Sequence, residues 1–129
     1  MNFRDAQIIL HIKQYCLVIN EATERLSNDY RQFAKDEVLR HSISMCLMQI
    51  GKLSGRLSQQ FKNQTMNRVM WGAIRSMRNW FAHEYTKMDL SEVWESATRD
   101  VASLLAFCNE TIEANPEAFA FPEIPEDDE

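Results

Sequence analysis

Apolar residues recur along this chain at alternating spacings of four and three positions, which is the period of one face of an α-helix. Four such stripes follow one another. Their members are Ile8, Ile12, Tyr15, Ile19, Ala22 and Leu26; then Leu39, Ile43, Cys46, Ile50, Leu53, Leu57 and Phe61; then Met66, Met70, Ala73, Met77 and Trp80 or Phe81; and finally Leu90, Trp94, Ala97, Val101, Leu104, Cys108 and Ile112. The stripes predict helices at roughly 3–26, 36–61, 66–84 and 90–114.

The placement of proline and glycine agrees with long helices. All three prolines lie from Pro116 onward, and the chain contains only three glycines. The expected connections, near 27–35, 62–65 and 85–89, are short enough to make successive helices antiparallel neighbours. Asp89 and Glu92 have the spacing of a capping box that would start the fourth helix. We therefore expect an all-α, up-and-down four-helix bundle over 1–115 and an acidic, proline-containing tail over 116–129.

The net charge of -5 conceals an uneven distribution. The tail holds six acids, and without them 13 acidic side chains remain against 14 basic ones, a formal charge of +1. Between Glu37 and Glu84 there is no acid but there are seven bases, so a phosphate-bearing partner is not excluded. Candidate RNA-binding residues are Arg75, Arg68, Lys52 and Arg56, with Arg40 and Lys62 extending the track. The alternative is a solvated basic face, because no exposed aromatic side chains are interleaved with these bases.

Several other residue types have ordinary structural interpretations. Three unpaired cysteines on apolar stripes are expected to be buried, reduced thiols of a reducing compartment. Trp71, Trp80 and Trp94 are expected to pack in the core or in a dimer interface. The two histidines outside the motif, His11 and His41, are expected on helix surfaces or packed against neighbours. The seven methionines are expected in an adaptable core or interface, and no cofactor is expected. No apolar run approaches the ~20 residues of a membrane span, and the first residues lack the order of a secretory signal, so a cytoplasmic protein is expected.

The stretch from Arg75 to Tyr85 carries the candidate chemistry. His83 has a side chain that can donate or accept a proton near neutrality. Arg78 can hold a phosphate, or the charge that develops on it, through its forked donors. Asn79 can orient either group, and Tyr85 offers a phenolic hydroxyl. A metal site is not expected, because Glu84 and His83 are adjacent and no third ligand is in register.

Helical geometry alone does not assemble this site. On one straight helix Arg78 and Tyr85 share a face, whereas Asn79 and His83 lie roughly 100–140° away. Either the helix unwinds around His83 or a second copy of the chain completes the site. A purely structural interpretation also remains open, in which the Arg and His side chains only tie down a helix end.

The sequence Arg78-Asn79-x-x-x-His83-x-Tyr85, followed by Asp89-Leu90-x-x-Val93-Trp94, resembles the R-x4-H-x-Y signature of HEPN-domain proteins. More narrowly, it resembles the HepT-like toxins that are paired with minimal nucleotidyltransferase (MNT) antitoxins. The resemblance extends over residues 4–113 and includes Ile50-Gly51 and a tryptophan, Trp71, that opens the third helix. One departure is Lys52, because the family often carries an acid at that position.

The resemblance implies a toxin of a toxin–antitoxin system: a metal-independent endoribonuclease, acting as a homodimer whose two motifs face one cleft. It implies Arg78 and His83 as catalytic residues and Asn79 as a supporting one. The MNT antitoxin would neutralise the toxin by AMPylation, the transfer of AMP to Tyr85. The alternative is a non-catalytic helical subunit that binds a nucleotidyltransferase partner or its nucleotide.

The acidic tail is expected to leave the helix and to regulate binding. Its acids could compete with RNA for the basic surface of the bundle. Its apolar residues could instead dock on the bundle or on a partner; these are Phe119, Phe121 and Ile124.

Overall fold

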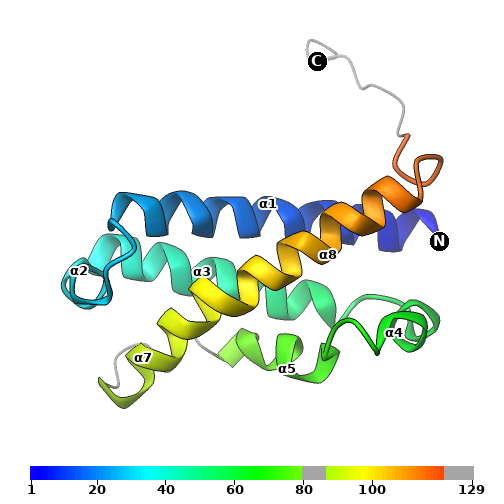
Figure 1. The fold of residues 1–129 in the computed structure, drawn as a ribbon. Coiled ribbons are helices and arrows are strands. Elements are labelled where there is room, and N and C mark those ends of the chain that lie inside the picture. Colours follow the sequence, from blue (N-terminus) through cyan, green and yellow to red (C-terminus); the bar gives the residue numbers. More distant parts are fainter. Residues whose placement is uncertain (80–86, 121–129) are drawn as a thin grey trace, which may run out of the picture.

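The computed structural model describes residues 1–79 and 87–120, and the expected all-α bundle is confirmed: no strand occurs in those residues (Figure 1). The elements are α1 (Phe3–Arg25), α2 (Tyr30–Lys35), α3 (Glu37–Ser54), α4 (Gln59–Thr65), α5 (Trp71–Ser76), η1 (Met77–Asn79), α7 (Lys87–Glu95), η2 (Ser96–Asp100) and α8 (Val101–Ala114).

The bundle is centred on α1, which packs against α3 and α8, while α3 packs in turn against α5 and η1 (Figure 1). The first, second and fourth apolar stripes supply most of the core. Ile12, Ile19, Ile43, Ile50 and Val101 are fully buried. The short helices lie at the two ends of α1, with α2 and α7 at one end and α4 at the other (Figure 1).

The predicted connection 27–35 contains a helix of its own. After α1, Ser27 and Asn28 adopt positive φ angles of 56° and 51°, which turns the chain back on itself. The side chain of Asp29 then accepts a hydrogen bond from the Arg31 amide and caps α2. Helix α2 places Phe33 in the core, with its ring centroid 5.0 Å from that of Trp94. Helix α2 has six residues, too few to show a helical period, so the spacing of apolar residues does not predict it.

The predicted single helix over 36–61 is wrong in its second half. Helix α3 ends at Ser54, and α4 begins after Ser58, whose hydroxyl accepts from the Phe61 amide. The start of α4 is fixed by Asp5 of α1, which is 2% exposed. Its carboxylate accepts from the Ser58 amide at 2.9 Å and from the Ser58 hydroxyl at 2.6 Å. Phe61 still reaches the core, but from α4.

The predicted helix over 66–84 is also wrong, in its start and in its buried face. Helix α5 begins at Trp71, as the resemblance implied, and Met66 and Met70 are 69% and 77% exposed. The core receives Val69, Trp71 and Ile74 instead, while Met77 of the predicted stripe is buried as expected. The spacing of four and three residues identifies one face only within a single continuous helix. Because the chain bends between α4 and α5, Met66 and Met70 do not share a helix with Met77.

The fourth predicted helix is present, and α7 includes residues from Lys87 onward, so Asp89 lies inside the helix and not at the predicted start. The helix continues through the π-helical turn η2 into α8. Beyond α8, Phe119 is half-buried against the core, which confirms docking for that residue. Phe121 and Ile124 lie outside the described residues.

The three cysteines are free and buried, as expected. Burial raises the pKa of the Cys46 thiol to about 11 and that of Cys108 to about 12, and burial also raises the pKa of Cys16. Within the described residues, every helix is too short or too polar to span a bilayer.

Candidate functional site

The described part of the motif lies in η1, a 3₁₀ turn that directly continues α5. Met77 is 2% exposed and anchors this turn in the core, while the side chains of Arg78 and Asn79 are exposed. The regular α-helix therefore ends at Ser76, before the motif. His83 and Tyr85 lie outside the described residues, as does Trp80.

Helix α3 supports this turn at a point where it carries a glycine. A Cβ atom added to Gly51 would lie 2.3 Å from the Arg78 amide nitrogen and 2.9 Å from the Arg75 carbonyl oxygen. Distances this short are not tolerated between atoms that are not bonded. Gly51 thus permits the backbone of η1 to lie directly on α3. The Ile50-Gly51 pair of the sequence is therefore part of the site's framework, with Ile50 in the core.

Two of the bases from the acid-free stretch are engaged in holding the fold. The Arg40 guanidinium donates to the Ala34 carbonyl at 2.8 Å and so binds the end of α2. The Arg68 guanidinium pairs with Glu110 at 2.6 Å and lies over the ring of Phe107.

Three of the other bases lie at the surface near η1. Lys52 and Arg56 are exposed at the C-terminal end of α3, and Arg75 is exposed one turn before Arg78. Within residues 1–79 and 87–120, none of these three forms an ion pair. A positive surface therefore adjoins the motif, built from α3 and α5.

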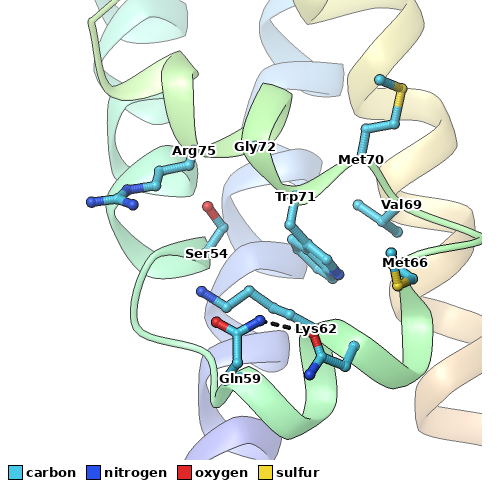
Figure 2. A pocket seen from close by; sticks show the side chains of 10 residues that line it. Ser54, Gln59, Lys62, Met66, Val69, Met70, Trp71, Gly72 and Arg75 are labelled. Atoms are coloured by element: carbon cyan, nitrogen blue, oxygen red, sulfur yellow. Dashed lines mark hydrogen bonds between the residues drawn. The ribbon is translucent and has the colours of Figure 1, made fainter.

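A pocket of about 450 Å³ lies between α4 and α5, next to this surface. Figure 2 shows that it has two unlike sides, separated by Trp71. The polar ends of Arg75, Ser54 and Lys62 lie on one side, and Met66, Val69 and Met70 line the other (Figure 2).

Trp71 is held rigidly as the centre of this pocket. Its indole Nε1 donates to the Thr65 hydroxyl at 2.9 Å, and its ring packs against those of Phe61 and Phe107. The predicted packing role of Trp71 is thus confirmed, as is that of Trp94, which packs against Phe33.

Sequence reasoning did not find the pocket itself. In the sequence, only the candidate bases Lys62 and Arg75 pointed to this region, because Met66 and Met70 were expected in the core.

No group of three or more metal-binding side chains of the types His, Cys, Asp and Glu occurs in the described part of the chain. The histidines outside the motif have ordinary positions, since His11 is exposed on α1 and His41 is half-buried on α3.

A family model described as "Ribonuclease HepT-like" matches residues 12–111, which run from α1 to α8 and include Arg78, His83 and Tyr85. The chain belongs to this family. This HepT-like chain is also 29% identical over 94 residues to a protein of Caldanaerobacter subterraneus subsp. tengcongensis named "Putative RNase TTE0752". That alignment covers 73% of the HepT-like chain and 81% of the relative. No solved structure matches the HepT-like chain. The family description and the relative's name both indicate ribonuclease activity.

Proposed function

We propose that this HepT-like chain is the toxin of a toxin–antitoxin system and a metal-independent endoribonuclease that cuts RNA with Arg78 and His83. One observation supports this assignment: α3 holds η1 at Gly51, with Arg78 exposed beside Lys52, Arg56 and Arg75, three bases that form no ion pair within the described residues. A guanidinium carried on a backbone packed against α3, at the edge of a positive surface, suits a phosphodiester that must be held during reaction.

In the proposed reaction, the His83 imidazole takes the proton of a ribose 2′-hydroxyl. The 2′-oxygen attacks the adjacent phosphorus and forms a new P–O bond, while Arg78 stabilises the charge on the pentacoordinate phosphate. The bond from phosphorus to the 5′-oxygen then breaks, and that oxygen collects a proton. The products are a 2′,3′-cyclic phosphate and a 5′-hydroxyl, and no water or metal ion enters the balance.

The reaction needs one base and one acid, and each chain supplies one His83. We propose a homodimer in which two copies of η1 face one cleft, so that one imidazole accepts the first proton and the other donates the second. Asn79, exposed beside Arg78 in η1, is proposed to orient the phosphate or the imidazole.

We also propose that an MNT-type nucleotidyltransferase is the antitoxin and that it transfers AMP to the Tyr85 hydroxyl. The added phosphate would bring bulk and negative charge next to Arg78, which would block the phosphate of the RNA.

The experiment is incubation of the purified chain with end-labelled RNA in the presence of a chelator. We expect cleavage by the wild type, and a loss of about 10²–10⁴-fold in His83→Ala, the contribution of one positioned proton-transfer group. Arg31→Ala is the matched control, because it removes an exposed base on α2, at the other end of α1 from α4. Equal cleavage by wild type and His83→Ala would contradict the assignment.

Incubation with the nucleotidyltransferase and ATP tests the antitoxin proposal separately. We expect a mass gain of whole AMP units that is absent in Tyr85→Phe. Modification without any RNA cleavage by the unmodified chain would favour the non-catalytic subunit instead, and modification of Tyr85→Phe would exclude Tyr85 as the acceptor.

A further inference from the structure

We propose that the pocket between α4 and α5 is a binding subsite for one nucleotide of the RNA strand, flanking the phosphate that is cut. This inference rests on the proposed ribonuclease function and adds a specificity site to it. The subsite is defined by Lys62, Met66, Met70, Trp71 and Arg75.

The position of the pocket suits a strand that also reaches Arg78. Arg75 stands at the edge of the pocket and precedes Arg78 by three residues on the same continuous helical segment, α5 and η1. A strand that crosses η1 at Arg78 therefore meets Arg75 and then the pocket. The volume of about 450 Å³ is within the usual range for a small-molecule site, so it can take one base with its sugar.

The polar side of the pocket has the chemistry of a phosphate site. Lys62 and Arg75 extend to the same side of Trp71 (Figure 2), and within residues 1–79 and 87–120 neither forms an ion pair. The lining contains no acid. The Arg75 side chain passes close to Gly55, where an added Cβ would lie at van der Waals distance, 3.6 Å, from Nε of Arg75. Two cations without an ion-pair partner among the described residues are therefore available for a phosphate on this side of the pocket.

The apolar side has the chemistry of a base site. Met66 and Met70 are 69% and 77% exposed, an unusual state for two neighbouring apolar side chains that face a pocket. Thioethers are polarisable and contact aromatic rings favourably. Gln59 and Asn63, joined by a hydrogen bond of 2.9 Å, also line the pocket and present amide groups that can meet the edge of a base.

Charge decides between RNA and a protein partner as occupant. Within residues 1–79 and 87–120 no acid pairs with Lys62 or Arg75, so the charge of these two pocket cations is not compensated there. An apolar side chain from a protein would use the methionines but would bury Lys62 and Arg75 without partners. A nucleotide satisfies both sides at once.

Gly72 provides a test that does not disturb the fold. It lines the pocket, and a Cβ there has no neighbour within 4 Å. Gly72→Gln and Gly72→Glu both place a side chain of the same size at the pocket, in a helix that tolerates either better than glycine. They differ in one negative charge, so their comparison separates charge from bulk. Arg31→Ala again serves as the control for loss of an unrelated base.

The measurement is the affinity for a fluorescein-labelled, fully 2′-O-methylated RNA oligonucleotide, which cannot be cleaved, followed by anisotropy over a series of salt concentrations. We expect Gly72→Glu to bind about tenfold more weakly than Gly72→Gln, the effect of one charged interaction. We expect Lys62→Ala combined with Arg75→Ala to reduce the slope of log affinity against log salt by about 0.7 for each phosphate that the two cations neutralise in the wild type.

Equal affinity and equal salt slope in all variants would overturn the subsite. A loss of dimer or of nucleotidyltransferase binding in both Gly72 variants, with unchanged RNA affinity, would also overturn it and assign the pocket to a protein. Because the probe cannot be cut, failure of the catalytic assignment leaves this result interpretable. Conversely, if His83→Ala abolishes RNA cleavage and Gly72→Glu leaves it unchanged, the ribonuclease assignment stands and only the subsite proposal is wrong.

Discussion

Gly51 of α3 lies directly against the backbone of Arg78, where a Cβ would come within 2.3 Å of the Arg78 amide nitrogen. The two residues are 27 positions apart in the sequence. Their contact sets how closely the backbone of η1 packs against α3. The exposed guanidinium is therefore carried on a backbone that rests on a core helix. This relationship gives the first test of the framework.

Gly51→Ala should lower the free energy of unfolding by about 1–3 kcal/mol, the usual cost of forcing an atom into a packed interior. It should also reduce RNA cleavage, because η1 must move away from α3. Gly72→Ala is the matched control for stability, since a Cβ there meets nothing within 4 Å. That substitution should raise stability by about 0.4–1 kcal/mol. Urea unfolding of both variants measures this, and equal stabilities would show that the close approach is not rigid.

Asp5 should be essential for the placement of α4. Its carboxylate is buried and binds both the amide and the hydroxyl of Ser58. Asp5→Ala leaves that amide without its partner and should cost about 1–3 kcal/mol. Glu24→Ala removes an exposed acid from the same helix and should change stability by less than about 0.5 kcal/mol. Thermal or urea unfolding distinguishes the two, and a similar small effect in both would contradict a capping role for Asp5.

The buried thiols should make stability fall in alkaline solution. The pKa of Cys46 rises from 9.0 to about 11 in the folded chain because of burial. Between these values the unfolded chain releases a proton that the folded chain still holds, so unfolding becomes easier as the pH rises. The urea midpoint measured across that window should decline, and the decline should be smaller in Cys46→Ala. A midpoint that is flat in the wild type over the same window would show that the thiols do not contribute.

Removal of residues 121–129 should strengthen RNA binding at low salt. This truncation removes Glu123, Glu126, Asp127, Asp128 and Glu129, and takes the formal charge from -5 to zero, while it keeps Phe119 on the core. Replacement of the same acids by their amides controls for the loss of length. Unchanged affinity at low ionic strength in both variants would discard a competing role for the tail.

The sequence was informative wherever one regular helix carries one continuous stripe. The faces that contain Ile12 on α1, Ile43 on α3 and Val101 on α8 were all predicted correctly, because the period of a helix is a local property. It was misleading at Met66 and Met70, where the same spacing crosses a bend that no proline marks.

Long-range relationships were beyond sequence reasoning. Asp5 and Ser58 are far apart in the chain, and neither residue alone signals a cap. A glycine inside a helix, as Gly51 is, suggests a close approach, but only the fold identifies Arg78 as the neighbour. For the motif, a position late in the third helical segment was predicted, and Arg78 and Asn79 lie in η1, which directly continues α5. The assembly of His83 and Tyr85 with them stays a prediction.

The most direct test of the central claim is the chemical identity of the RNA ends that the purified chain produces in the presence of a chelator. Attack by the 2′-hydroxyl, with His83 moving the proton and Arg78 holding the phosphate, predicts 2′,3′-cyclic phosphate and 5′-hydroxyl ends that are not formed by His83→Ala. Ends that carry a 5′-phosphate, or cyclic phosphate ends formed equally well by His83→Ala, would contradict it.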